Sequence, residues 1–176
     1  MRTILAFLIL GFMIASPQAF AQKYKIAKGY SVKFDGGGDV AGSFKELSGT
    51  IVFNETDLTK SSVSLTIKTG SVNTGNGMMN NHAKGKEWFD AKGFPTITFT
   101  SKSFAKTAKG YDVTGTLEMK GVKKEITIAF TFTKTEKGGE FKAKFQVDRT
   151  DYGVGKKEGT VGAAIKLDFV IPVTKA

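Results

Sequence analysis

The chain has 176 residues, no Cys, one His and a formal net charge of +10 that comes almost entirely from Lys. The absence of thiols excludes disulfide bridges, a Cys nucleophile, an iron–sulfur cluster and a Cys-based zinc site. A chain of this length is typical of a single domain with a core of its own.

The N-terminal segment has the parts of a secretory signal peptide. Arg2 precedes an apolar run over residues 4–15, and Ala19-Phe20-Ala21 supplies the small residues of a cleavage site. The apolar run is too short for a comfortable membrane span, and no Cys follows it that could carry a lipid anchor. We therefore expect residues 1–21 to be a signal peptide and residues 22–176 to form the mature domain.

Eight stretches of the mature domain alternate between apolar and polar residues. Alternation at period two predicts half-buried antiparallel strands, and glycine-rich turns between the stretches suit tight hairpins. Together they predict an all-β fold, either an antiparallel barrel or a sandwich. The expected strands cover residues 23–34, 43–54, 62–68, 96–100, 111–117, 126–133, 141–147 and 165–171.

One connection, over residues 73–95, lacks this alternation. Asn76 can cap a short helix over residues 77–88. The helix is expected to be weak, because Gly77 and Gly85 each cost about 1 kcal/mol relative to Ala. The sequence thus predicts a short helix that depends on packing and forms a lid between the third and fourth strands.

A closed eight-stranded sheet has an interior just wide enough for side chains or for one small ligand. Many of the 15 Phe residues fall on the apolar faces, so the interior is expected to be aromatic, dry and nearly free of charge. Burial gives about 0.8 kcal/mol per CH₂ group, whereas an exposed ion pair gives only about 0–1 kcal/mol. Such a barrel suits a hydrophobic chain, with polar groups at the mouth setting its orientation.

Short motifs spread over nearly the whole mature domain resemble, in their order and spacing, those of the YceI-like family of exported lipid-binding proteins. No motif is decisive alone, and the set carries the resemblance. The motifs are Gly42-Ser43-Phe44, Gly49-Thr50-Ile51-Val52-Phe53, Ser71-Val72-Asn73-Thr74-Gly75-Asn76, His82, Trp88-Phe89-Asp90, Phe94-Pro95-Thr96-Ile97-Thr98-Phe99-Thr100-Ser101, Val113-Thr114-Gly115-Thr116-Leu117, Gly121-Val122-Lys123-Lys124 and Arg149-Thr150-Asp151-Tyr152-Gly153-Val154.

The resemblance implies a lipocalin-like antiparallel β-barrel, a long-chain isoprenoid or related amphiphile held inside it, and a periplasmic location. The family is not known for a catalytic mechanism. The chain departs from the family pattern at Met79-Asn80, where an Arg-Asp pair is usual, and at Lys120, where a His is frequent. It also lacks the family His around residues 30–38. These changes remove polar groups that could contact a headgroup.

We expect twelve residues to contact the ligand and none to be catalytic. His82 has no acid within one helical turn, which favours a structural place at the lid over catalysis, and as a lone His it argues against a specific metal site. Trp88, Phe89 and Phe94 are interpreted as a plug or a gate at one barrel end. Arg149 could pair with Asp151 or meet an anionic headgroup. The expected ligand contacts are Ile67, His82, Trp88, Phe89, Phe94, Phe99, Ile128, Phe130, Phe132, Phe145, Arg149 and Phe169.

The scattered Lys residues are typical of a soluble surface, with weak attraction to anionic lipid headgroups as the alternative. The predicted export and the lack of a basic patch interleaved with aromatics argue against nucleic acid. A soluble carrier for a hydrophobic chain, as a monomer or a homodimer, is the leading hypothesis. The alternatives are a small-barrel enzyme acting on a lipid, which needs paired titratable groups in its pocket, and an outer-membrane barrel with its apolar face outward.

Processing at the expected site can be checked directly. We expect the exported protein to begin at Gln22, because Ala19-Phe20-Ala21 places small residues at the cleavage site. Intact-mass measurement of the exported form is the test. A mass that still includes residues 1–21 contradicts the prediction.

Overall fold

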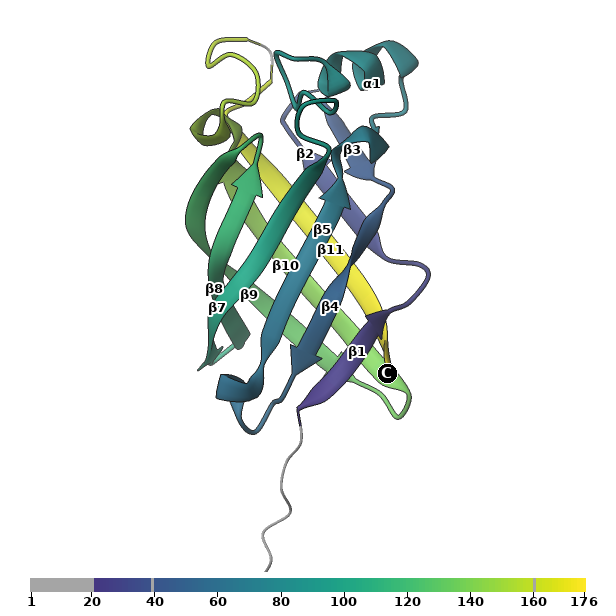
Figure 1. The fold of residues 1–176 in the computed structure, drawn as a ribbon, viewed down its shortest axis with the longest axis vertical. Coiled ribbons are helices and arrows are strands. Elements are labelled where there is room, and N and C mark those ends of the chain that lie inside the picture. Colours follow the sequence, from purple (N-terminus) through teal and green to yellow (C-terminus); the bar gives the residue numbers. More distant parts are fainter. Residues whose placement is uncertain (1–20, 39, 160) are drawn as a thin grey trace, which may run out of the picture.

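The computed structural model describes residues 21–38, 40–159 and 161–176, so the predicted signal peptide, apart from Ala21, lies outside the described residues. Strands make up most of the described chain, and the helix α1 (Gly77–Lys84) stands at one end of the sheet (Figure 1). The strands are β1 (Gln22–Ile26), β2 (Ser31–Asp35), β3 (Ala41–Phe44), β4 (Leu47–Phe53), β5 (Ser62–Lys68), β6 (Val72–Asn73), β7 (Thr96–Thr107), β8 (Gly110–Met119), β9 (Val122–Lys134), β10 (Gly138–Asp148) and β11 (Ala164–Lys175), and the 3-10 turns are η1 (Leu58–Lys60), η2 (Thr69–Ser71) and η3 (Arg149–Tyr152).

Eight strands close into an antiparallel barrel in the order β1-β4-β5-β7-β8-β9-β10-β11, with β11 pairing back to β1. The other three strands continue the wall beyond the end of β1, because β2 pairs with the first half of β11, β3 with β2, and β6 with β3. The prediction of an eight-stranded antiparallel barrel with a short helix between its third and fourth strands is therefore confirmed.

Two of the predicted strands are broken. The stretch 23–34 forms β1 and β2, and the stretch 43–54 falls on β3 and β4. Tyr30 bridges both breaks, because its hydroxyl donates to the Lys45 carbonyl oxygen at 2.8 Å and accepts from the Leu47 N–H at 3.1 Å. The inward-facing residues of β1 and β2 fit a single alternating pattern, so alternation alone gives no sign of the break between these two strands.

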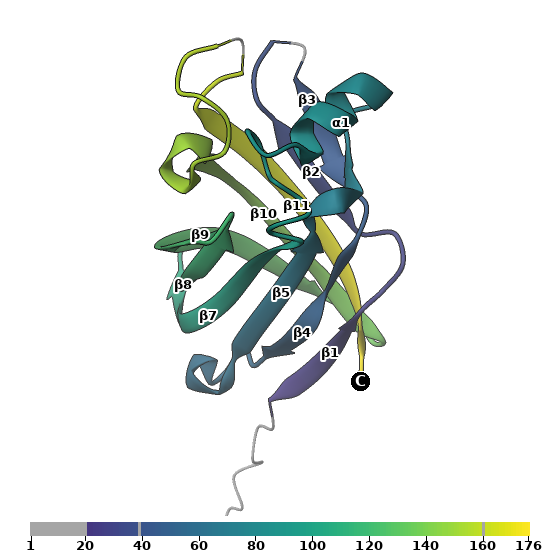
Figure 2. The same ribbon diagram turned by 45° about the horizontal axis from the view of Figure 1, so that its top comes forward.

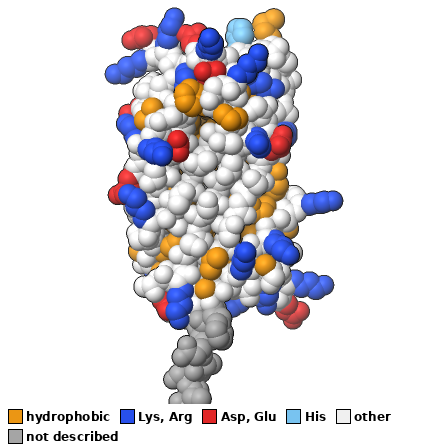
Figure 3. Space-filling model, in the orientation of Figure 1, with side chains coloured by type: hydrophobic (Ala, Val, Ile, Leu, Met, Phe, Trp, Pro, Cys, Tyr) orange, Lys and Arg blue, Asp and Glu red, His pale blue; other side chains and the backbone are white. Residues whose placement is uncertain are grey.

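The larger apolar face of the strands points into the barrel. In β9, Ile126, Ile128 and Phe130 are half-buried and face the interior, whereas Thr127 and Thr131 are exposed. Charged side chains of both signs are scattered over the outer face seen in Figure 3. The structure thus decides the direction of the apolar faces, which the period-two pattern left open.

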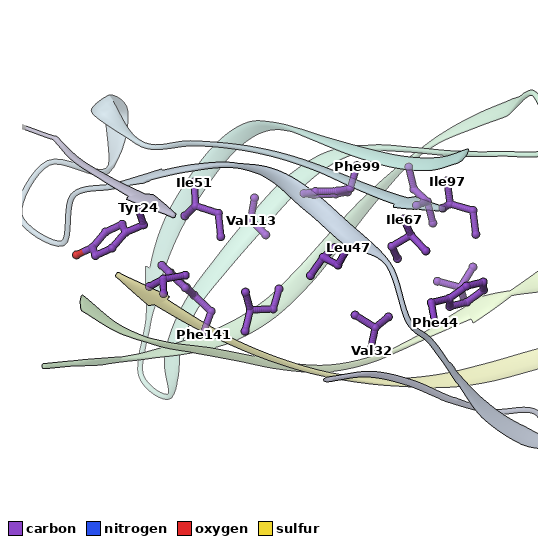
Figure 4. Close-up of a cluster of buried hydrophobic side chains, with 14 of the residues drawn as sticks. Tyr24, Val32, Phe44, Leu47, Ile51, Ile67, Ile97, Phe99, Val113 and Phe141 are labelled. Carbon is purple, nitrogen blue, oxygen red and sulfur yellow. The ribbon is translucent and has the colours of Figure 1, made fainter. Parts of the chain in front are cut away.

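Aromatic side chains fill the end of the barrel opposite α1. Phe53, which is 2% exposed, lies at their centre. Figure 4 shows Tyr24 and Phe141 at this end of the core. Such ring pairs contribute about 0.5–1.5 kcal/mol each beyond their burial. We name this cluster the aromatic floor; ring centroids 5.0–6.2 Å from that of Phe53 belong to Phe104, Tyr111, Phe130, Phe132 and Phe141, and Tyr24 packs on Phe132 and Phe141.

The tyrosines of the aromatic floor are held in their neutral form. Burial first, and the nearby carboxylate of Glu55 second, raise the pKa of Tyr24 and of Tyr111 above the usual tyrosine value. The Tyr111 hydroxyl also donates a hydrogen bond to Glu55 Oε1 at 3.3 Å. The floor therefore brings no buried charge into the barrel.

The helix α1 lies at the opposite end. Asn76 caps it as predicted, since its side-chain oxygen accepts from the N–H groups of Met78 at 2.9 Å and Met79 at 3.2 Å. The helix ends at Lys84 rather than at residue 88, because Gly85 adopts an extended backbone and is a poor helix former. Within the described part of the chain, no helix is long and apolar enough to span a bilayer.

Removing the central ring of the aromatic floor should destabilise the protein strongly. We expect Phe53→Ala to lower the free energy of unfolding by about 3–5 kcal/mol, because it leaves a cavity among tightly packed rings. Thr131→Ala, on the exposed face of β9, should change it by less than about 0.5 kcal/mol. Urea titration of both variants is the measurement, and equal midpoints would contradict the central position of Phe53.

Candidate ligand-binding cavity

A cavity of about 400 Å³ lies between the aromatic floor and α1. Its volume falls within the range of small-molecule sites in proteins. Inward side chains from most strands of the barrel form its wall, among them Ile51, Ile67, Phe99 and Val113, which Figure 4 shows inside the barrel. The cavity therefore combines a volume inside the barrel with a mostly apolar wall.

The structure brings together ten of the twelve predicted ligand contacts in this wall. They come from both sides of the barrel, from the lid end and from the edge of the aromatic floor. Their contact with a ligand stays a prediction. The ten are Ile67, His82, Trp88, Phe89, Phe99, Ile128, Phe130, Phe145, Arg149 and Phe169.

Phe94 and Phe132 do not line the cavity. Phe132 belongs to the aromatic floor, where its ring stacks on Phe141 with centroids 4.4 Å apart. Phe94 is 37% exposed and packs against Gly121 in the β8–β9 turn, outside the barrel. The chain turns just before Phe94, where the Phe94 N–H donates to the Asp90 carbonyl oxygen at 2.7 Å. Contrary to the prediction, Phe94 therefore does not lie at the cavity end with Trp88 and Phe89.

Phe104 lines the cavity and was missed by the sequence analysis. In β7 the inward positions begin at Ile97 and Phe99, and strict alternation would then place Phe104 outside. A register shift between Ser101 and Ser103 adds one residue to the strand and turns Phe104 inward. No sequence signal marks this bulge.

Arg149 is buried at the lid end of the cavity, with 4% exposure. Its guanidinium donates to three backbone carbonyl oxygens, those of Gly162 at 3.0 Å, Val154 at 2.8 Å and Val161 at 2.8 Å. The ring of Trp88 lies over the guanidinium, with its centroid 5.2 Å from Cζ. Arg149 therefore fixes the loop after η3 and one side of the lid at the same time.

The predicted pair of Arg149 with Asp151 is wrong. Arg149 begins the turn η3 instead of continuing a strand, so the two residues do not share a face. Asp151 is exposed and pairs with Lys124 at 2.9 Å. Asp148 caps η3, and hydrogen bonds from the hydroxyl and N–H of Thr150 hold the pKa of its carboxyl below the usual value.

Residues 77–89, which comprise α1 and the loop after it, form a lid over the cavity. Met79, His82 and Ala83 line the cavity from α1, so His82 lies at the lid as predicted. The Asn80 side-chain oxygen ties the helix to the wall by accepting from the N–H of Thr74 at 2.7 Å. The Asn80 side chain thus helps to hold α1 against the wall.

The loop part of the lid makes the firmer contacts. Phe89 packs edge-on against Phe44 with centroids 5.6 Å apart, and such a pair contributes about 0.5–1.5 kcal/mol. The contact of Trp88 with buried Arg149 is of the desolvated cation–π kind, which contributes about 2 kcal/mol. Lifting this part of the lid would cost both contacts and expose two large aromatic side chains.

The titratable side chains among the lining residues are His82, Lys142 and Arg149. Acid–base catalysis needs a group that can take a proton beside one that orients or activates it, and no described Asp or Glu lines the cavity. In residues 21–38, 40–159 and 161–176, no cluster of three or more His, Asp or Glu side chains is arranged to hold a metal ion. The arrangement can hold and orient an apolar molecule.

The YceI-like domain matches residues 24–173, which is most of the 176-residue chain. The chain belongs to the YceI-like family. It is 30% identical over 156 residues to the UPF0312 protein YE1254 of Yersinia enterocolitica, covering 84% of this chain and 81% of that protein. It is 31% identical over 134 residues to Protein YceI of Salmonella arizonae, covering 72% of this chain and 70% of that protein.

Several solved structures have a similar fold. Burkholderia cenocepacia BcnA superposes with a TM-score of 0.76 at 27% identity, covering 82% of this chain and 96% of that one. The YCEI protein of Campylobacter jejuni gives 0.71 at 24% identity, with 100% and 99% coverage. A polyisoprenoid binding domain from Saccharophagus degradans gives 0.64 at 18% identity, with 89% and 100% coverage. The last two likenesses concern the fold alone.

The structural role of Arg149 can be separated from that of its acidic neighbour. We expect Arg149→Lys to lower the free energy of unfolding by about 3 kcal/mol or more, because a lysine cannot reach all three carbonyl oxygens and hydrogen bonds to charged groups contribute about 1.5–3 kcal/mol each. Asp151→Asn removes only an exposed ion pair, which contributes about 0–1 kcal/mol. Equal losses in urea titration would show that the guanidinium contacts contribute little.

Proposed function

We propose that the protein is an exported carrier that holds the hydrocarbon chain of a long-chain isoprenoid, or of a similar amphiphile, inside its barrel. The observation that carries the proposal is the cavity of about 400 Å³ with its mostly apolar wall. Each CH₂ group moved from water into such a cavity contributes about 0.8 kcal/mol. Membership of the YceI-like family supports the same function, since a domain with this fold from Saccharophagus degradans is a polyisoprenoid binding domain.

The chemistry of the two cavity ends suggests the orientation of the ligand. The aromatic floor offers only apolar side chains to the cavity, among them Phe53 and Phe130. The lid end offers Thr74, His82 and Arg149. Because burying an unpaired polar group is costly, the chain should point to the floor and the polar end to the lid.

A binding function is favoured over catalysis by the lining of the cavity. The titratable side chains of the wall are His82, Lys142 and Arg149, and no described Asp or Glu lines the cavity with them. An outer-membrane barrel would need an apolar band on the outer face, whereas the outward residues of β9 include Thr127 and Thr131. Both observations support a carrier that works in water.

A periplasmic location belongs to the same proposal. It is supported by the signal-peptide pattern of residues 1–21 and by family membership. A transient contact with an anionic membrane surface would be helped by the positive net charge of +10. That contact stays a prediction from composition, and a monomeric or homodimeric state stays an expectation.

Three proteins test the carrier function through the lipid that co-purifies with them. Phe130 lines the cavity at the edge of the aromatic floor, so Phe130→Ala should deepen the cavity and alter the chain lengths carried. Its stability cost should be about 3–5 kcal/mol. Phe130→Glu should eject the lipid, because the carboxylate would meet a dry wall. Mass spectrometry of organic extracts from the wild type and both variants is the measurement.

Thr131→Glu is the matched control, one residue along β9 on the exposed face. It should carry the same lipids as the wild type at little cost in stability. If the wild type carries no lipid after gentle purification, or if the wild type, Phe130→Ala and Thr131→Glu carry identical lipid, the barrel interior is a filled core and the carrier function is refuted.

A further inference from the structure

The ladder between β9 and β10 is incomplete. The two strands have 13 and 11 residues but share five pairs, from Gly139–Lys134 to Ala143–Phe130. On their other sides they are paired far more extensively, β9 with β8 over nine pairs and β10 with β11 over eleven. Residues 122–129 and 144–148, all of them described, form no pairs with each other, and the strands diverge toward the lid end (Figure 2). We name this gap the side slot.

The cavity reaches the side slot. Ile126 and Ile128 of β9 line the cavity, and so does Phe145 of β10. Lys142 also lines the cavity, although it is exposed and alternation directs its side chain to the outer surface. The cavity therefore extends to β10 beside the last pair that β9 and β10 share.

The divergence has a structural cause on each strand. The bulge between Ser101 and Ser103 bends β7 and increases its twist, and β8 and β9 follow because they are paired to it in turn. On the other strand, the ring of Phe145 packs against Phe169 of β11 with centroids 5.5 Å apart. Each edge of the slot is therefore held by its own neighbour rather than by the strand across the gap.

Exposed contacts close the upper end of the side slot. Lys124 pairs with Asp151 at 2.9 Å, and the Lys120 ammonium donates to the carbonyl oxygens of Gly153 at 2.8 Å and Glu87 at 3.1 Å. Such surface contacts contribute little and exchange readily with water. The lid, in contrast, is held by the Phe44–Phe89 packing and by the contact of Trp88 with a buried guanidinium.

We propose that the side slot is the path by which the hydrocarbon chain of a ligand passes between water and the cavity, while the lid stays shut. The apolar side chains at the slot, Ile126, Ile128 and Phe145, offer a continuous apolar route into the cavity. Widening the slot breaks exposed contacts, whereas lifting the lid breaks buried ones. The inference rests on the proposed carrier function and adds a route of access and the strand edges that control it.

Bridging the slot tests the route. If the register of the five shared pairs continued toward the lid, Thr127 would lie opposite Gln146. Both residues are exposed on the outer face. In Thr127→Cys/Gln146→Cys the two new thiols are the only ones, because the chain has no Cys. A bifunctional methanethiosulfonate reagent with a flexible spacer then joins the strands, and a reductant releases them. The control is Thr133→Cys/Glu140→Cys, which receives the same bridge across an existing pair of the same ladder.

The probe is all-trans-retinol, an isoprenoid alcohol whose binding quenches tryptophan fluorescence by energy transfer. Trp88 is the only Trp of the chain and lines the cavity, so quenching reports arrival of the probe in the barrel. We expect the bridged slot variant to take up and release retinol at least ten-fold more slowly than the same protein after reduction. The bridged control should stay within two-fold of its reduced form.

The outcomes separate the route from the carrier function. If the wild type binds retinol and bridging the slot leaves both rate constants within two-fold, the chain passes elsewhere and the inference is overturned while the carrier function stands. If the wild type binds no retinol and carries no lipid, both are overturned. Slowing in the bridged control as well would show that rigidity of the barrel, not the slot, limits exchange, and would also overturn the inference.

Discussion

The packing of aromatic rings around Phe53 divides the interior of the barrel into two unlike halves. One half is filled by side chains that meet edge to face within 5.0–6.2 Å of that ring. The other half, whose wall includes Phe99, Phe145 and Phe169, contains a cavity of about 400 Å³. A closed sheet of eight strands allows either outcome, a packed core or a ligand site. This barrel contains both, a packed cluster of rings around Phe53 and a cavity between that cluster and the lid.

The hollow half needs a cover, and the chain builds it from a helix that is weak by itself. Gly77 begins α1 and Gly85 follows its last residue, and no residue of the helix is buried. Its position is set from outside the helix, by the Asn80 side chain bound to Thr74 and by aromatic residues of the following loop. Arg149 completes this arrangement, because its guanidinium binds three carbonyl oxygens and supports Trp88. A buried cation thus stabilises the cover without a carboxylate partner among the described residues.

The wall of the hollow half is also less regular than that of the filled half. The bulge in β7 turns Phe104 toward the floor and bends the strands that follow. β9 and β10 are also unpaired where the cavity lies, while the five pairs they share lie beside the aromatic floor. The wall between these two strands is therefore closed by backbone pairing beside the floor and lacks that pairing beside the cavity.

The sequence by itself determined the strand content and the helix cap, because both depend on local physics. Alternation marked the residues that share a face, such as Ile128 and Phe130, and Asn76 carried the cap signal. The resemblance in motifs indicated the family, and ten of the twelve residues selected as ligand contacts lie in one wall.

Only the tertiary structure decided the features that depend on partners distant in sequence. The breaks between β1 and β2 and between β3 and β4 follow from a change of neighbouring strands, which alternation does not encode. Phe104 reversed its face at a bulge without a sequence signal. Arg149 found carbonyl oxygens up to 13 residues away instead of the acid two positions on. Strand pairing, register shifts and buried hydrogen bonds are long-range contacts, and a local pattern cannot specify them.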